Sequence, residues 1–500
     1  MGVGENKDKK LLLFQLGPVQ EFIAQAATPV DLWAGSYLLS SIMKAGLDQL
    51  NDKGVPREDV VFPNISDCSI EKALEQNIPT LPNRFLAKVP SNVDAEWVNQ
   101  IGKAMKAKLL DLAKNGNSAL DVGAHKQLEQ FLSITWAIAP MSGDMKKDYE
   151  SITTLLGMRR NIRDFSPWAE EKACERLPKD FLSGRESAIY GKRGAANALK
   201  VQLASTQKYS AEIQRAYADE KYYAVVCFDG DRIGKHLSGL ASDDDHRDFS
   251  VALARFALGV KTVISEVEYD RGTDKPQIVK VGDKGILVYA GGDDVMAVVP
   301  ARAAINVASA LRRNFGKMVS GLTASVGVAI GHKKVPFQDL VYAARAAEHR
   351  AKVKYDRNAF SLTVLKRSGE KLGWGFKWEN GEANDGRGNA IKLYDMVWNA
   401  DKDANLSGRF PHKLAQILQP YDVQAKDAAA MINVVKADVA HVWGRSLSSG
   451  GATDKVTSAA MPPSVVGDYL NDTYGKSHPE DFLNLFLVET FIKRPKEDEK

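Results

Sequence analysis

The chain has 500 residues, of which 44% are hydrophobic and 26% charged, and its 67 basic and 63 acidic residues leave a formal net charge of +4. This composition is typical of a folded protein and excludes a largely disordered one, and the length predicts three or four domains. The balanced charge gives no overall sign of nucleic-acid binding, although local basic patches can still provide it.

Cysteine content and hydropathy bear on the cellular compartment. Cys68, Cys174 and Cys227 are too few and too scattered for a disulfide framework or a four-thiolate zinc site. The N-terminal apolar run, residues 11–16, is too short for a signal peptide or a membrane span. We therefore expect a cytoplasmic protein that has no membrane contact.

The first part of the chain, residues 1–140, alternates short apolar runs with helical patterns. We predict strands at 11–17, 59–63, 84–90 and 132–140, and helices at 18–50, 94–114 and 123–131. This order indicates a ferredoxin-like sandwich without an acidic motif, the first of two palm-like domains. Residues 141–220 are rich in Lys, Arg and Gly and predict a mostly helical linker domain.

Residues 221–370 carry the clearest pattern, and we predict a second palm domain there. The apolar run 221–231 ends in acidic residues and predicts a buried strand, and 247–267 has apolar residues at helical spacing. Further β runs, two of them flanking a Gly-Gly turn, and helical runs then complete a β-α-β-β-α-β order, the topology of polymerase palms and nucleotide cyclases. The β runs are 277–283, 284–290, 295–299, 322–330 and 360–365, and the helical runs include 305–311 and 336–355. Residues 371–500 begin with Gly-, Asn- and Asp-rich loops and then predict an α-helical C-terminal domain. The expected fold class is therefore α+β, with two ferredoxin-like palms, a helical linker and an α-helical C-terminal domain.

Two acidic clusters stand where a palm places its metal ligands. Asp229 ends the first strand of the second palm, with Asp231 beside it, whereas Asp293 and Asp294 lie on the hairpin that should pair with that strand. Joining nucleotides builds negative charge on the attacking and leaving oxygens, and two Mg²⁺ or Mn²⁺ ions held by shared carboxylates can neutralise it. We expect Asp229, Asp293 and Asp294 to be catalytic, and Asp229, Asp231 and Asp293 to bind metal.

Glycines flank both clusters and would let phosphate approach the backbone. We predict nucleotide contacts at Gly230, Gly234, Gly291 and Gly292. Taken alone, GGDD is also an ordinary hairpin turn and DGDRIG an acid-capped helix start, so the prediction rests on their combination. Residues 230–236 fail the phosphate-loop pattern, and the histidines make no metal-ligand pair at helical spacing.

Several ordered motifs resemble the large subunit of type III-B (Cmr-type) CRISPR effector complexes. They are FQLGPVQEFIAQA…DLWAGSYLLS (14–40), PNRFLA (82–87), DGDRIGK (229–235), AGGDD (290–294), SVGVAIGHKKVPF (325–337), AKVKYDRNAFSLTVLKRSG (351–369) and LFLVETFIKR (485–494). The resemblance implies two palms face to face, partner subunits, a guide RNA, and synthesis of a signalling nucleotide from ATP, usually cyclic oligoadenylate, when target RNA binds. It also places Lys352 where related cyclases hold the triphosphate, although an exposed helical lysine fits the residue pattern equally.

The sequence departs from that family in three places. The family's N-terminal HD nuclease domain is missing, so we expect no HD nuclease activity. The cysteine knuckle is reduced to Cys174 and residues 181–191, so we expect no zinc. The basic stretch that many relatives have after the first helix is replaced by Ala27, Thr28, Pro29 and Val30.

Two other functions stay open from sequence. The acidic motifs alone fit a stand-alone nucleotide cyclase, and a catalytically silent palm could serve as a scaffold for guide and target RNA. The additional domains argue against the first, and retention of all four acidic residues argues against the second.

Overall fold

A computed structural model describes the chain over residues 9–19, 22, 29–63, 79–116, 128–129, 131–162, 221–271, 277–378, 388–399, 409–419, 428–446, 462–474 and 478–493. Cys174, residues 181–191, most of the linker and most of the helix expected at 123–131 lie outside these ranges, as do Ala27 and Thr28. Within them, no helix is both long and apolar enough to cross a membrane.

The first sheet is built by alternation of buried side chains. Its strands β1 (Lys9–Gly17), β2 (Val60–Phe62), β3 (Arg84–Pro90) and β4 (Ser133–Pro140) pair antiparallel in the order β2-β3-β1-β4. Along β1, Leu12 and Phe14 face the core formed with α2 (Pro29–Asp52) and α4 (Ala95–Gly116), whereas Leu11 and Leu13 belong to the core that contains α6 (Met145–Asn161). This strand order is that of a ferredoxin-like sandwich.

The second sheet has the order β12-β11-β10-β5-β9-β8. Its strands are β5 (Tyr222–Gly230), β8 (Ile286–Gly291), β9 (Asp294–Pro300), β10 (Ala324–His332), β11 (Ala359–Leu365) and β12 (Lys371–Lys377). The part β10-β5-β9-β8 repeats the ferredoxin-like order. One face packs Phe228 against Phe256 of α10 (Asp243–Glu266) and Phe315 of α11 (Ala304–Met318). The opposite face carries α12 (Phe337–Val353). The α+β fold with two palms is therefore confirmed.

Two details differ from the sequence expectation. The β run at 277–283 forms only β7 (Ile278–Lys280), which pairs with β6 (Glu268–Asp270) in a separate ribbon. Residues 371–377, expected to be largely loop, form β12, which pairs antiparallel with β11. Gly373 and Gly375 favour a loop, yet Leu372, Trp374 and Phe376 alternate with them, are buried and make the strand part of the palm core.

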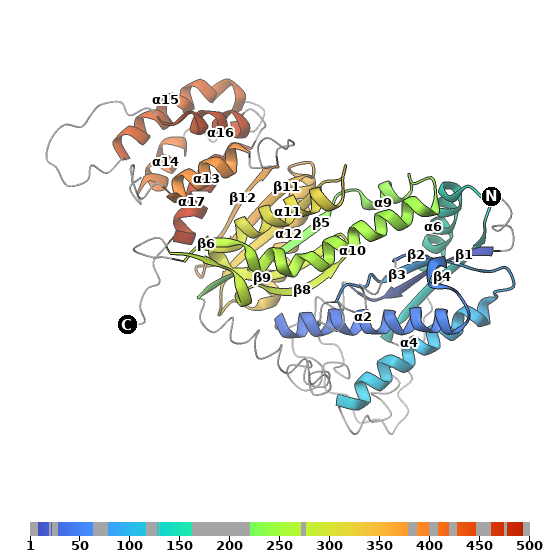
Figure 1. Ribbon diagram of the computed structural model, residues 1–500. Coiled ribbons are helices and arrows are strands. Elements are labelled where there is room, and N and C mark those ends of the chain that lie inside the picture. The colour runs from blue at the N-terminus through green and yellow to red at the C-terminus, as the bar shows by residue number, and fades with distance from the viewer. Residues whose placement is uncertain are drawn as a thin grey trace.

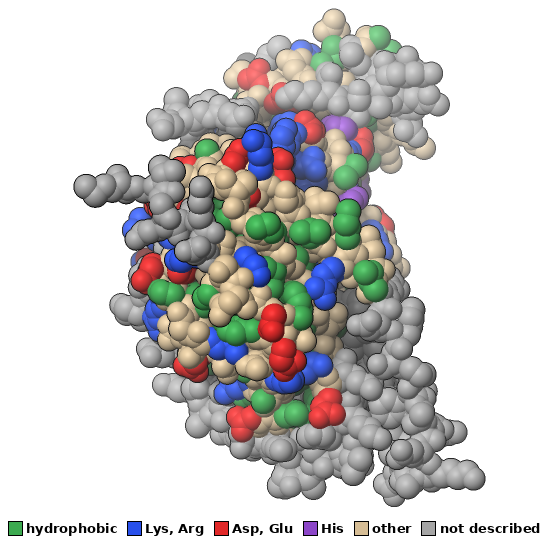
Figure 2. Space-filling model, turned by 90° about the vertical axis from the view of Figure 1, so that its right-hand side faces the viewer, with side chains coloured by type: hydrophobic (Ala, Val, Ile, Leu, Met, Phe, Trp, Pro, Cys, Tyr) green, Lys and Arg blue, Asp and Glu red, His purple; other side chains and the backbone are tan. Residues whose placement is uncertain are grey.

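Helices close the C-terminal end of the molecule. They are α13 (Asn389–Asn399), α14 (Phe410–Leu418), α15 (Ala428–Ser446), α16 (Ser464–Tyr474) and α17 (Glu480–Lys493). Figure 1 shows these helices beyond the second sheet, on the side away from the first sheet. The second palm therefore lies between the first palm and the C-terminal helices. On the face in Figure 2, basic and acidic side chains are interspersed.

The two palms share a hydrophobic core. It includes Phe14 and Leu39 from the first palm and Val225, Val288 and Leu340 from the second. Polar contacts border it: the Ala290 N–H donates to the Pro79 carbonyl at 3.2 Å, Lys88 pairs with Asp243, and Arg247 donates to the Glu58 carbonyl. This packing fixes the palms face to face and positions the site between them.

Candidate active site

Three aspartates meet where β5, β9 and the β8–β9 turn come together. Asp229, at the end of β5, is directly opposite Asp294, the first residue of β9. Because paired residues of neighbouring strands project to the same face, both side chains lie on the α12 side of the sheet. Asp293 precedes Asp294 in the turn.

The GGDD segment is a tight hairpin turn. Gly291 pairs with Asp294, and Gly292 and Asp293 form the two-residue loop. Gly292 has φ of +79°, the left-handed backbone that favours glycine at the first position of such a turn. The Gly230 N–H donates to the Asp293 carbonyl at 3.0 Å and ties the turn to the end of β5. The segment is therefore an ordinary hairpin turn, as its composition indicates. It also positions the two acidic residues Asp293 and Asp294.

A cavity of about 270 Å³ separates the palms above these aspartates. Residues of the second palm that line it include Asp229, Gly291, Asp293, Asp294 and Arg345. From the first palm the lining includes Ser36, Ser40, Phe62, Asn83 and Arg84. The cavity therefore has acidic groups on one wall and a cation from each palm.

Helix α12 carries a charged stripe toward this site. Arg345, Glu348 and Lys352 are three and four residues apart, so they share one face of the helix. The Lys352 ammonium donates to Asp229 Oδ2 at 2.6 Å and lies 2.5 Å from Glu348 Oε1. Lys352 thus reaches the aspartate cluster without lining the cavity itself.

The electrostatics of the aspartates follow from burial and crowding. Burial, followed by the nearby Asp229 carboxylate, raises the pKa of Asp293 to about 6 and that of Asp294 to about 7. Burial also raises the pKa of Asp229, although the Lys352 ammonium opposes that rise. Burial disfavours the charged form of Lys352, but its two carboxylate partners outweigh this effect and raise its pKa. The cluster holds more negative charge than its surroundings stabilise, and an added cation would relieve it.

The donor set suits a hard divalent ion. Carboxylate oxygens are the ligands that Mg²⁺ and Mn²⁺ prefer, and Asp229, Asp293 and Asp294 offer them at one edge of the sheet. Their ligand atoms do not converge into a single sphere: among the described residues, the only acidic or His/Cys trio whose ligand atoms all lie within 4.8 Å is at positions 478, 480 and 481. The residues fit the metal in type and location, and side-chain rotation would be needed for them to share it.

Asp231 has a different position from the other three. Its side chain is 3% exposed and accepts hydrogen bonds from the Thr323 and Ser325 hydroxyls at 2.7 Å each, and from the Asn358 N–H at 2.8 Å. It does not line the cavity. Both of its oxygens are engaged inside the fold, where Asp231 holds the β5, β10 and β11 ends together, and the expectation that Asp231 binds a metal stays a prediction.

The four glycines expected to contact nucleotide have different positions in the structure. Gly291 lines the cavity, and Gly292 shapes the turn. Gly230 packs against Asp293, where a Cβ atom would lie 2.9 Å from the Asp293 Cβ. Gly234 lies in α9 (Ile233–Leu237), outside the cavity lining.

Family comparisons agree with this architecture. The model of the family described as Cas10/Cmr2, second palm domain, matches residues 222–361, and that of CRISPR-associated protein Cmr2, N-terminal, matches residues 11–114. Two separate segments of the chain are therefore similar to the Cas10/Cmr2 family. The CRISPR system Cmr subunit Cmr2 of Pyrococcus furiosus is 23% identical over 551 residues, in a match that covers 74% of this chain and 63% of that protein.

Solved structures show the same fold as this chain. A type III-B Cmr-beta structure in the apo state matches with a TM-score of 0.60 and 10% identity, covering 94% of this chain and 82% of that one. A Csm1–Csm4 cassette in complex with pppApA matches with a TM-score of 0.55 and 15% identity, and Csm1 of T. onnurineus with 0.52 and 16%. Each of the latter two covers 98% of this chain and 70% of the other.

Sequence reasoning missed three charged residues of this site. Arg345 and Glu348 stand on α12 at the same spacing as Lys352, in a helix otherwise rich in alanine, and that stripe is a signal that could have revealed them. Arg84 starts β3 within the PNRFLA motif, and nothing in its local pattern shows that it faces Asp293.

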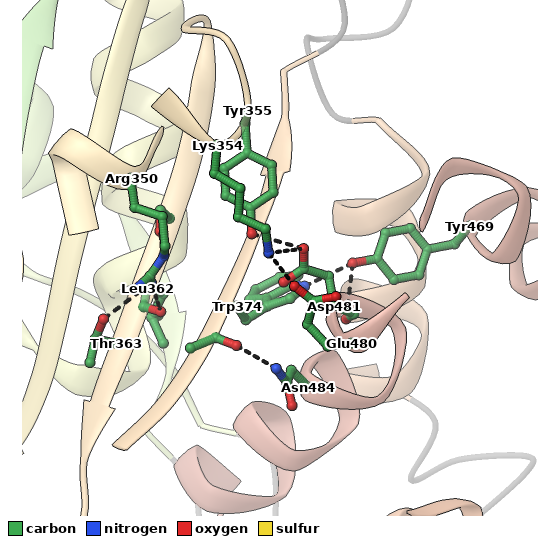
Figure 3. Close-up of polar contacts among 12 residues, drawn as sticks. Arg350, Lys354, Tyr355, Leu362, Thr363, Trp374, Tyr469, Glu480, Asp481 and Asn484 are labelled. Atoms are coloured by element: carbon green, nitrogen blue, oxygen red, sulfur yellow. Dashed lines mark hydrogen bonds and ion pairs between the residues drawn. The ribbon is translucent and has the colours of Figure 1, made fainter. Parts of the chain in front are cut away.

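A second polar cluster joins the second palm to α17 (Figure 3). Lys354 donates to Glu480 at 2.6 Å and to Asp481 at 3.0 Å, and the Tyr355 hydroxyl donates to Asp481 at 2.8 Å. His478, which sequence reasoning treated as a surface or core residue, lies beside Glu480 and Asp481. Because Lys354 and Tyr355 of the palm side already donate hydrogen bonds to these acids of α17, we assign the cluster to domain attachment.

Proposed function

We propose that this chain is the nucleotide-synthesising subunit of a type III-B CRISPR effector complex. In that role it joins ATP molecules into an adenylate signal, cyclic oligoadenylate or a related product, when the complex binds target RNA. Its partners would be the other subunits of the complex, the guide RNA and the target RNA. The matches of two chain segments to Cas10/Cmr2 family models support this assignment.

One observation supports the reaction type above all others. Asp229 and Asp294 are cross-strand neighbours, with Asp293 adjacent, on the wall of a cavity that the two palms enclose. Asp229, Asp293 and Asp294 would hold Mg²⁺ or Mn²⁺, which supplies charge neutralisation at the attacking hydroxyl and the departing pyrophosphate. The Csm1–Csm4 relative that binds pppApA shares the fold and favours ATP as the substrate here.

The reaction needs two nucleotides in one place. A ribose hydroxyl oxygen of one ATP forms a bond to the α-phosphorus of the other, the bond to pyrophosphate breaks, and the hydroxyl proton passes to solvent. Arg84 and Arg345 face the cavity from opposite palms and would bind phosphate oxygens of the two nucleotides. The shared core holds the palms in register, so the two substrates would be oriented before they react.

A double substitution tests this function. Asp293→Ala with Asp294→Ala should lower product formation by the reconstituted, target-bound complex at least about a hundredfold, because the transition state loses its charge-stabilising ligands. Product from ATP and Mg²⁺ is measured by anion-exchange chromatography and mass spectrometry, and assembly by gel filtration. Complex assembly should not change.

The matched control removes two exposed acidic residues of the same palm, Asp248→Ala with Asp283→Ala, and should keep full activity. Wild-type synthesis by the Asp293/Asp294 variant would refute the assignment. No product from the wild-type complex with target RNA would favour the scaffold function, and synthesis by the isolated chain would favour a stand-alone cyclase.

A further inference from the structure

The Asp229 carboxylate already has a cationic partner. Lys352 Nζ lies 2.6 Å from Asp229 Oδ2, and both side chains are partly buried, with 23% of Lys352 and 32% of Asp229 exposed. An ammonium ion in this position neutralises the same charge that a divalent ion would neutralise. Metal and lysine therefore compete for Asp229, because two cations at one carboxylate repel each other.

Glu348 offers Lys352 a second anionic partner. Its Oε1 lies 2.5 Å from Nζ, and only 18% of its side chain is exposed. Glu348 and Lys352 are separated by four residues, hence by one helical turn, so the ammonium can leave Asp229 through side-chain rotation and keep an ion pair. Without Glu348, the ammonium would have Asp229 as its only partner among the contacts described for it.

The position of Glu348 is fixed by close packing of α12 on the sheet. A Cβ atom at Gly327 in β10 would lie 2.1 Å from the Glu348 backbone nitrogen and 2.4 Å from the Ala344 carbonyl oxygen. The helix backbone thus contacts the strand backbone at this point. Since Gly327 pairs with Cys227, two residues before Asp229, the carboxylate of Glu348 is held next to the cluster.

We propose that Lys352 is a tethered cation that occupies Asp229 until the metal binds, and that Glu348 is a positioning residue that accepts the ammonium when Asp229 is released to the metal. This inference rests on the proposed function, in which Asp229 is a metal ligand. It gives Lys352 a role before nucleotide arrives, and it separates Glu348 from the three metal-binding aspartates.

A double-mutant cycle on the full chain distinguishes this exchange from direct metal binding by Glu348. Free Mn²⁺ is measured by electron paramagnetic resonance, without nucleotide, for the wild type, Lys352→Met, Glu348→Gln and the double variant. Lys352→Met should bind Mn²⁺ about tenfold more tightly, which is about 1.4 kcal/mol. Glu348→Gln should bind it at least about threefold more weakly, because the ammonium then stays on Asp229.

The double variant decides the question. Without the Lys352 ammonium, loss of the Glu348 carboxylate should not change Mn²⁺ affinity. The Mn²⁺ affinity of the double variant should therefore match that of Lys352→Met within about twofold. If Glu348→Gln weakens Mn²⁺ binding equally with and without Lys352, Glu348 acts as a ligand or through its charge, and the exchange is refuted. Lys352→Gln provides the same comparison if the methionine variant unfolds, as judged by thermal melting.

Asp229→Asn keeps failure of this inference distinct from failure of the proposed function. Loss of Mn²⁺ binding in that variant, together with an additive cycle, would overturn only the exchange. Mn²⁺ binding that survives Asp229→Asn would overturn the metal site on which the proposed function depends.

Discussion

At the level of single residues, Asp294 is a carboxyl group whose ionised form is unfavourable in its surroundings. It is partly buried at the start of β9 and faces the Asp229 carboxylate, and these two causes raise its pKa from 3.8 to about 7. The guanidinium of Arg345 offsets only part of the effect. A residue that served stability alone would have no reason to be ionisable here, which favours a functional role.

The raised pKa has a consequence for stability without metal. Between pH 4 and 7 the folded chain keeps a proton that the unfolded chain loses, so the free energy of unfolding falls as pH rises through that range. Asp294→Asn removes this dependence. In EDTA it should raise the free energy of unfolding at pH 8 by on the order of 2–4 kcal/mol, and change it little at pH 4.

Urea unfolding at the two pH values, followed by fluorescence, measures the difference. Asp283→Asn, an exposed acid of the same palm, should behave like the wild type at both. An equal effect of Asp294→Asn at pH 4 and pH 8 would show that packing, and not charge, is responsible.

At the scale of elements, Asp231 links three chain segments. Its oxygens join the end of β5 to Thr323 before β10, to Ser325 in β10, and to Asn358 before β11. Asp356, Arg357 and Asn358 all have positive φ, a conformation that non-glycine residues adopt at a cost, so the bond to the Asn358 N–H stabilises a strained turn. That turn follows α12, the helix that carries Lys352.

Asp231→Ala should therefore destabilise the second palm. It leaves two hydroxyls and one backbone N–H without their acceptor inside the fold, which costs about 2–4 kcal/mol. Asp229→Ala is the matched comparison, since it removes a carboxylate whose burial is unfavourable, and it should leave the unfolding midpoint unchanged or higher. Thermal melting of both variants without metal checks this, and a normal melting temperature for Asp231→Ala would show that Asp231 has no such structural role.

At the scale of the whole molecule, the C-terminal helices are attached next to the active site. Lys354 and Tyr355, which bind Asp481 of α17, follow Lys352 by two and three residues. The contact continues through Trp374 of β12, whose indole N–H donates to the Tyr469 hydroxyl at 2.8 Å, and through Asn484, which donates to the Gly373 carbonyl at 2.6 Å (Figure 3). A displacement of α17 would thus act directly on the end of α12.

Asp481→Ala should loosen this attachment. It leaves the Lys354 ammonium and the buried Tyr355 hydroxyl without their shared acceptor, and loss of one member of a buried charge pair costs about 3–5 kcal/mol. Hydrogen–deuterium exchange should become faster in residues 354–358 and 480–493, while the β1–β4 sheet keeps its protection.

Glu480→Ala is the control for this variant. Glu480 binds the same lysine, but its side chain is 54% exposed, so its loss should cost no more than about 1 kcal/mol. Exchange that rises equally in both variants would contradict the central role of the buried Asp481.

Both palms and the position of the acidic motif could be predicted from local sequence patterns. Alternating and continuous apolar runs at 11–17, 221–231 and 322–330 predict strands because a strand must bury one face or both, and this requirement is local. The turn at 291–294 could also be predicted from the sequence, since a two-residue hairpin loop with a left-handed first position favours glycine. Glycine content was misleading at β12, where Leu372, Trp374 and Phe376 alternate with two glycines in a buried strand.

The surroundings of each acidic residue depend on how distant segments pack together. Asp229 and Asp231 are two residues apart and look equivalent in sequence, yet one faces the cavity and the other is bound by groups that lie 92 to 127 residues away. Arg84, Glu348 and Lys352 enter the site from another palm or another element. Hydrogen-bond partners and local electrostatics depend on which segments pack together. The residue types therefore predict the kind of chemistry, whereas the packing determines which residue faces the cavity and which is bound inside the fold.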